Sequence, residues 1–319
     1  MFNGLVLAAL TISSLKSEVA ALSSAPSGAI TVGSSGTYST LTEALEDTSS
    51  DVYFVYSGTY DGQVLIDRDD ITIYGQTDTD DSYSGNTVII TGDTTADEAG
   101  SDAESATVRI TASGVSLYNI DIENTYGTEE EHSQAIALSI EAGDGGTFGG
   151  YGINVSGYQD TLLVESGYQF YGNSYIEGAV DFIFGQYGSV WITNSVINCV
   201  GTGYITASGR SSDDAYWYVI NSSTVEGDGE VYLGRPWADY ARVVFQSTAL
   251  GSNIQSAGWS VWSESEPNIE YVTFAEYGNT GDGASGDRAS FATKLDNAVD
   301  ITTVLGSDYT SWVDSDFLD

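Results

Sequence analysis

The sequence predicts an all-β protein, a parallel β-helix (solenoid) with one short N-terminal helix. Three observations support this prediction. The 319 residues include 37 glycines but only three prolines, and Val, Ile, Thr and Tyr are frequent, a composition that favours strands. Short strand-like segments follow one another without helices between them. A loose repeat also returns every roughly 20 to 30 residues, as expected when each repeat is one coil of a solenoid.

The one predicted helix lies near the N-terminus, in the segment TLTEALEDTS (40–49). Thr40 is the expected N-cap residue, and Glu43 three positions later completes a capping box. Leu41, Ala44 and Leu45 would then lie together on one side of the helix.

The strands begin after this helix. They are expected in the segments 52–58, 70–76, 86–92, 106–112 and 115–124. The polar, acidic segment 93–105 is expected to be a long loop. A helical period returns only at about 291–295.

The repeat is clearest from about residue 118 onward, in YNIDIEN, YGINVSG, GNSYIEG, TNSVINC and INSSTVEG. The pairs Asn173–Ser174, Asn194–Ser195 and Asn221–Ser222 are spaced by 21 and then 27 positions. Strands joined by short turns cannot form βαβ units. The alternative is an antiparallel β-sandwich, whose hairpin signals are weak in this chain.

The chain is expected to have one domain, residues 26–319, after an extension of residues 1–25. The apolar stretch from Leu5 to Leu15 is too short to span a membrane and resembles a signal peptide, although Lys16 and Glu18 follow it closely. We therefore expect a secreted, extracellular protein, with a disordered extension as the alternative. A monomer is expected.

The charge restricts the partners. Eight basic and 46 acidic residues give a net charge of −38, which excludes nucleic acid and disfavours anionic membranes. Such a surface suits high salt or acid. With Cys199 and His132 as the only residues of their types, a Cys- or His-based metal site is not expected, and no EF-hand calcium loop occurs.

The coil spacing brings five polar residues onto one wall. Asp160 precedes Asp181 by 21 positions, about one coil, and Gln134 precedes Asp160 by 26. Arg235 follows Asp181 by 54 positions, about two coils. Because residues one coil apart stack in a solenoid, these residues and Gln159 could meet.

The residue types on this wall suit acyl transfer from an ester. A salt bridge from Arg235 would keep Asp181 anionic and explain its burial among aromatic residues. Asp160 could then hold a proton, since neighbouring carboxylates split their pKa values. Gln134 and Gln159 supply amide donors for an oxyanion. Taken one at a time, each residue also has an ordinary structural role.

Five ordered motifs resemble the signature set of the pectin methylesterases (pectinesterases, carbohydrate esterase family 8), in particular the fungal type. The resemblance extends from about Pro26 to the C-terminus. It implies a right-handed β-helix that hydrolyses the methyl esters of galacturonate in pectin, releasing methanol and de-esterified pectin without a cofactor. The motifs are SQAIAL (133–138), GYQDTLL (157–163), GAVDFIFG (178–185), ITASGR (205–210) and YLGRPW (232–237).

The resemblance also implies roles for these residues. Asp181 would be the nucleophile, and Asp160 the general acid and then base. Gln134 and Gln159 would stabilise the oxyanion, and Arg235 would hold Asp181. The residues expected to line the sugar-binding cleft are Tyr158, Val180, Phe184 and Trp237.

Two features depart from the family pattern. Gly62, in GTYDG, stands where the family's GxYxE stretch has Glu. The loss of this Glu is expected to affect local stability more than chemistry. The high negative charge should repel pectin as it loses methyl groups, so we expect a preference for heavily methylated pectin. Arg210, Arg235 and Arg242 would leave the cleft less negative than the rest.

Other functions fit less well. A pectate lyase would need calcium carboxylates, and a polygalacturonase would need several clustered Asp; neither explains the two Gln residues. A Ser-His-Asp esterase is disfavoured, because His132 is the only His and no G-x-S-x-G motif occurs. The alternative outside catalysis is a β-helical polysaccharide-binding protein.

Overall fold

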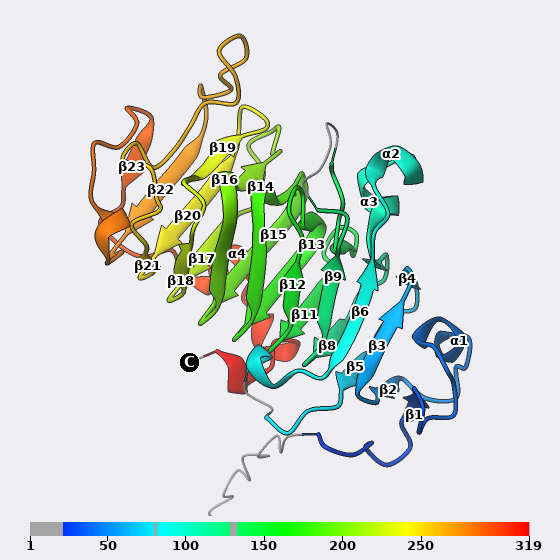
Figure 1. Cartoon of the computed structure of the whole chain (residues 1–319). Coiled ribbons are helices and arrows are strands. Elements are labelled where there is room, and N and C mark those ends of the chain that lie inside the picture. The colour runs from blue at the N-terminus through cyan, green and yellow to red at the C-terminus, as the bar shows by residue number, and fades with distance from the viewer. Residues whose placement is uncertain (1–21, 80–81, 128–132, 319) are drawn as a thin grey trace, which may run out of the picture.

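The chain forms a right-handed parallel β-helix, shown by a computed structural model that describes residues 22–79, 82–127 and 133–318 (Figure 1). Every pairing between two strands in this described part is parallel, and the pairings form three ladders, which we treat as three sheets. Parallel ladders without helical crossovers rule out the antiparallel sandwich. The predicted segment 1–25 lies largely outside the described residues, as do Glu129–Glu131 and His132, so the domain boundary stays a prediction.

The first sheet runs the length of the stack, and the second lies beside it. The first contains β1 (Ile30–Val32), β2 (Val52–Val55), β5 (Thr72–Gly75), β8 (Val115–Tyr118), β11 (Thr147–Tyr151), the second half of β13 (Leu162–Gly172), β15 (Tyr187–Thr193), β17 (Tyr218–Asn221), β20 (Arg242–Gln246), β22 (Thr273–Tyr277) and β23 (Ala292–Lys294). The second contains β3 (Gly58–Asp61), β6 (Val88–Gly92), β9 (Asp121–Asn124), β12 (Asn154–Ser156), the first halves of β14 (Tyr175–Gly185) and β16 (Val196–Ser208), β18 (Thr224–Gly227) and β21 (Ala249–Leu250).

The third sheet carries the polar wall. It contains β4 (Val64–Ile66), β7 (Val108–Ile110), β10 (Leu138–Glu141), the first part of β13, the second halves of β14 and β16, and β19 (Val231–Pro236). The long strands β13, β14 and β16 each bend and serve two sheets. β13 passes from the third sheet into the first, whereas β14 and β16 pass from the second into the third, and the bend of β14 places Asp181 of the wall at that passage.

The N-terminal helix is confirmed as α1 (Leu41–Leu45), with both hydrogen bonds of the Thr40–Glu43 capping box. The prediction of a loop at 93–105 is wrong, because two short helices form there, α2 (Ala96–Ala99) and α3 (Asp102–Ser105). A second capping box, Thr95 with Glu98, starts α2. Single-turn 3-10 helices lie at Tyr83–Gly85, Asp282–Ala284, Tyr309–Ser311 and Ser315–Phe317.

The predicted helical period at 291–295 is also wrong. Phe291 packs inward against the core, and β23 (Ala292–Lys294) continues the first sheet instead. The C-terminal helix is α4 (Ile301–Leu305), which Asp300 caps through a hydrogen bond from the Thr302 amide. The N-cap residue, rather than the apolar spacing, marks this helix.

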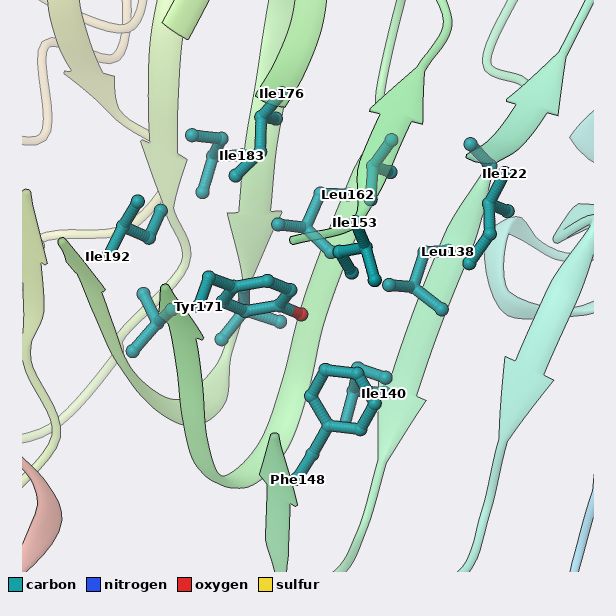
Figure 2. Packing of buried hydrophobic residues seen from close by; sticks show 14 of the residues in the cluster. Ile122, Leu138, Ile140, Phe148, Ile153, Leu162, Tyr171, Ile176, Ile183 and Ile192 are labelled. Atoms are coloured by element: carbon teal, nitrogen blue, oxygen red, sulfur yellow. The ribbon is translucent and has the colours of Figure 1, made fainter. Parts of the chain in front are cut away.

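The core fills the inside of the coils with stacked aliphatic and aromatic side chains (Figure 2). Leu138, Leu162 and Ile183 occupy equivalent positions on successive coils of the third sheet, and all three are fully buried. Each such side chain contributes about 1.5–3 kcal/mol of burial free energy. This stacked core fixes the register of the polar wall outside it.

A ladder of hydroxyl groups reinforces the register inside one bend. The amides of Ser174, Ser195 and Ser223 each donate to a hydroxyl one coil further on, belonging to Ser195, Ser223 and Thr248 in turn. The repeat predicted from Asn173, Asn194 and Asn221 therefore holds for the first two coils. In the third coil it is offset by one residue, because Ser222 rather than Asn221 takes the left-handed backbone.

A C-terminal strap, residues 301–318, runs back along the outer face of the first sheet. Figure 1 shows this red segment beside the middle of the stack. The Asp314 carboxylate accepts a hydrogen bond from Tyr118 at 3.0 Å, and Phe317 packs against the ring of Tyr151. The strap therefore ties the C-terminal segment to β8 and β11, in the middle of the first sheet.

Gly62 follows β3 with a left-handed φ of 112°. A side chain there would meet no neighbour within 4 Å, but the backbone conformation itself favours glycine.

No helix in the described part of the chain is long and apolar enough to cross a membrane.

Candidate active site

The backbone at the two wall aspartates is unusual. Asp160 and Asp181 have φ values of 64° and 53°, in the left-handed region that Asp enters more readily than most residues. At Asp181 this kink breaks the alternation of β14, so Phe182 and Ile183 both enter the core. The kink leaves the Asp181 carboxylate on the outside of the coil, although the residue is only 6% exposed.

Arg235 binds Asp181 through two parallel hydrogen bonds. Nε lies 2.9 Å from Oδ1, and Nη2 lies 2.5 Å from Oδ2. The guanidinium lies between two aromatic rings, 4.1 Å from the centroid of Tyr204 and 4.2 Å from that of Trp262. This bidentate, stacked arrangement holds the arginine in one orientation.

The polar wall faces a cavity of about 270 Å³. The cavity contains all five polar residues predicted to meet, and the predicted cleft residues Phe184 and Trp237 also line it. Its lining is Asp102, Gln134, Gln159, Asp160, Asp181, Phe184, Ala207, Arg235, Trp237 and Trp262. Figure 1 shows α2 and α3 and the orange loop near residue 262 rising at the same end of the strands.

Tyr158 and Val180 are not among the residues lining this cavity. Val180 is half-buried and pairs with Gln159 and Tyr204 in the sheet. Tyr158 lines a neighbouring, more open cavity of about 390 Å³, which also includes Glu123 and Glu177.

The two glutamines occupy equivalent positions on adjacent coils, paired through a parallel bridge. The Ser133 hydroxyl donates to Gln159 Oε1 at 3.2 Å, which leaves Nε2 as the free end of that amide. Within the described part of the chain, neither glutamine donates a side-chain hydrogen bond. The cavity therefore holds two amide donors that are available to a ligand.

Burial and neighbouring charges shift the pKa values of Asp160 and Asp181 to different extents. Burial, with the negative charges of Asp181 and Asp102, raises the pKa of Asp160 well above its ordinary value. Burial also raises the pKa of Asp181, but the hydrogen bonds and positive charge of Arg235 oppose this rise. Of the two carboxyls, Asp160 is therefore the one that holds a proton more readily.

Sequence reasoning missed Asp102, Ala207 and Trp262. Ala207 belongs to a quoted motif, but Asp102 and Trp262 lie on segments without a repeat signal. Arg210 and Arg242, which were expected to leave the cleft less negative, do not line the cavity. Arg210 is buried and pairs with the carboxylates of Asp213 and Asp214, whereas Arg242 pairs with the Asp213 carboxylate and donates to the Asp214 carbonyl oxygen.

The fold and the cavity together define a class, that of enzymes with paired carboxylates on the outer wall of a parallel β-helix. In the described ranges no group of three or more His, Cys, Asp or Glu side chains is arranged to hold a metal ion. The Pectinesterase family model matches residues 29–299. The chain belongs to the pectinesterase family, whose members are carboxylic ester hydrolases.

Fungal proteins are among its relatives. The chain is 50% identical to a pectinesterase of Aspergillus aculeatus, over 93% of this chain and 95% of the relative. It is 45% identical to a pectinesterase of Aspergillus niger, over 92% and 93% respectively. The crystal structure of the Aspergillus niger pectin methylesterase in deglycosylated form matches with a TM-score of 0.85 and 43% identity, over 92% of this chain and 98% of that one.

Proposed function

We propose that the cavity hydrolyses galacturonate methyl esters of pectin with Asp181 as the nucleophile and Asp160 as the general acid and base. The bidentate bond from Arg235 to Asp181, beside an Asp160 whose pKa is raised by burial, is the observation that supports these roles. One carboxylate is oriented and anionic, and the other is neutral and able to donate a proton. These are the two states that the two halves of ester hydrolysis require.

In the first half, an Asp181 oxygen attacks the carbonyl carbon of the ester. The carbonyl oxygen becomes an oxyanion, which the free amide groups of Gln134 and Gln159 stabilise. The bond from carbon to the methoxy oxygen then breaks, and Asp160 gives its proton to that oxygen. Methanol leaves, and an anhydride joins the galacturonate carbonyl to Asp181.

In the second half, the Asp160 carboxylate takes a proton from water as the water oxygen attacks the galacturonate carbonyl carbon. The bond to the Asp181 oxygen breaks, which releases the galacturonate acid and restores the Asp181 carboxylate. Asp160 holds its proton again. Throughout, Arg235 keeps Asp181 oriented between Tyr204 and Trp262.

The experiment is methanol release from highly methylated pectin by wild type, Asp181→Asn and Asp61→Asn. Asp61 is exposed and does not line the cavity, so it controls for the lost charge. We expect release by wild type and Asp61→Asn, and a loss of about 1,000-fold or more in Asp181→Asn, with its circular dichroism and its pectin binding retained. Wild type that binds pectin and releases no methanol would instead favour a polysaccharide-binding protein.

The polymer is proposed to run along the strand direction. Residues lining the open cavity precede those lining the catalytic cavity in the same coils, as Tyr158 precedes Gln159 and Glu177 precedes Asp181. Tyr158 would thus contact a sugar next to the reacting one. Tyr158→Ala should raise KM for pectin more than it lowers kcat.

Secretion and a monomeric state complete the proposal. Pectin is a cell-wall polymer, so an enzyme acting on it is expected outside the cell; the protein should be recovered from culture medium lacking its first residues. Among the described residues the large exposed apolar side chains, Leu65, Tyr187, Val200 and Tyr271, come from widely separated positions, which supports a monomer. Light scattering after size-exclusion chromatography tests that state.

A further inference from the structure

A third carboxylate, that of Asp102, lines the catalytic cavity opposite the sheet. Asp102 is the first residue of α3, so it comes from a segment outside the coils. It is half-buried, and burial raises the pKa of its carboxyl group. Asp102 has no role in the two steps of ester hydrolysis proposed for this cavity.

The position of Asp102 is fixed by the coil that carries Gln134. The Ser105 hydroxyl donates to the Asp102 carbonyl oxygen at 2.7 Å and accepts from the Ile136 amide at 3.2 Å. The Ala96 amide donates to the Gln134 carbonyl oxygen at 2.8 Å. Two separate bonds therefore hold the α2–α3 segment over the cavity.

The charge of Asp102 is not neutralised by a partner. Within the described ranges no residue donates a hydrogen bond to its carboxylate or forms an ion pair with it. The nearest arginine in the sequence, Arg109, binds Glu104 and Glu141 instead. Arg235 is already paired with Asp181. Glu165 interacts with Asp102 electrostatically, but as an acidic residue it cannot neutralise the Asp102 charge.

The carboxyl groups that face the cavity differ in their partners. Arg235 offsets the charge of Asp181, and burial beside acidic neighbours makes Asp160 the carboxyl that holds a proton more readily. When Asp102 is ionised, no cation among the described residues that line the cavity offsets its charge. A methyl ester entering this cavity is neutral, whereas the hydrolysed galacturonate carries a carboxylate.

We propose that Asp102 is a specificity-determining residue that excludes the free galacturonate carboxylate and so favours the methyl ester over the product. The proposal rests on the proposed function, since it assumes that the ester carbonyl occupies this cavity. Repulsion inside a partly buried cavity is less screened than repulsion from the exposed acidic surface. One carboxylate at this position can therefore discriminate between the methyl ester and the free galacturonate more strongly than an equal charge on the exposed surface.

The test is binding of a fully de-esterified galacturonate oligomer at pH 7 and one fixed salt concentration, measured by calorimetry. The proteins are wild type, Asp102→Asn and Asp97→Asn. Asp97 is exposed on the neighbouring α2, so its variant has the same net charge as Asp102→Asn. We expect Asp102→Asn to bind the oligomer about 5- to 10-fold tighter than wild type, and Asp97→Asn to bind it within about twofold.

Equal affinities for the two variants would overturn the proposal, because the charge would then act only through the whole surface. Circular dichroism checks the fold, and Asp102→Ser replaces Asp102→Asn if the latter does not fold. The same oligomer should also inhibit methanol release more strongly in Asp102→Asn than in Asp97→Asn. If wild type releases no methanol, the proposed function fails while the binding comparison still decides the role of Asp102.

Discussion

Arg235 and Asp181 are joined by a two-point salt bridge across 54 positions of sequence, and both side chains are largely buried. A carboxylate this buried, in a cavity lined by Phe184, Trp237 and Trp262, would be unstable without such a partner. The salt bridge thus explains why β14 carries a charge.

Arg235→Lys should impair catalysis without unfolding the protein. A lysine cannot form two parallel bonds or stack between two rings, so we expect kcat/KM to fall about 100-fold or more. Because lysine makes fewer hydrogen bonds to Asp181, it counters the effect of burial on the Asp181 pKa less than arginine does. The pKa of Asp181 therefore rises further, and the acidic limb of the pH–rate profile moves to higher pH. Arg288→Lys, which alters the bidentate pair with Glu276, is the matched control; an equal loss there would contradict the assignment.

Stability should fall as the pH rises from about 5 to 8. Burial raises the pKa of Asp160 well above normal, that of Asp121 to about 6 and that of Glu165 to about 7. Because these carboxyls bind protons more tightly in the folded state, the free energy of unfolding falls as the pH rises through their folded pKa values. Thermal unfolding between pH 5 and 8 measures this trend, and a melting temperature that rises with pH would contradict it.

Asp160→Asn should stabilise the protein at pH 8 while abolishing methanol release. An amide carries no charge to bury, so we expect a melting temperature about 2–4 °C above that of wild type at pH 8 and a smaller difference at pH 5. Opposite effects on activity and stability separate a functional residue from a structural one. Lower stability at both pH values would indicate that Asp160 serves the fold.

Ser195→Ala should destabilise the stack and leave the reaction intact. The Ser195 hydroxyl accepts from the Ser174 amide and donates to the Thr193 carbonyl oxygen. Its loss leaves a buried N–H without a partner, at a cost of about 1–3 kcal/mol. Urea unfolding measures the loss; Ser265→Ala, at an exposed loop position, should change stability by less than about 0.5 kcal/mol.

Activity on highly methylated pectin should increase with salt. With a net charge of −38, the enzyme repels partly de-esterified chains, and about 0.1 M salt limits that repulsion to about 10 Å. The expected result is a lower KM between 20 and roughly 200 mM salt, with most of the change late in the reaction. A rate that declines with salt would count against this reading.

The sequence predicted the coil register well because the motifs with the polar wall residues repeat with it. The spacing of Asp160 and Asp181 placed them on adjacent coils, and two coils further on Arg235 met Asp181 as expected. The left-handed backbone at both aspartates could not be predicted, since it depends on how the strands bend between two sheets.

The failures occurred where local signals compete with tertiary packing. The segment 93–105 was expected to be a loop because it is polar, although Thr95 and Glu98 formed a readable capping box. Asp102 was missed for the same reason. The segment 291–295 had apolar spacing suited to a helix, but β22 offered an open sheet edge on which β23 could form.

The C-terminal strap has a consequence for how the chain reaches its native state. In an open solenoid each coil touches only its neighbours, so coils can fold one after another as they are synthesised. Here Tyr118 forms its hydrogen bond with Asp314, 196 positions later, and Tyr151 packs against Phe317, which also lies far downstream in the chain. Such distant contacts slow folding and couple the coils into one cooperative unit. A chain truncated before residue 301 should therefore unfold in broader, less cooperative steps than the complete protein.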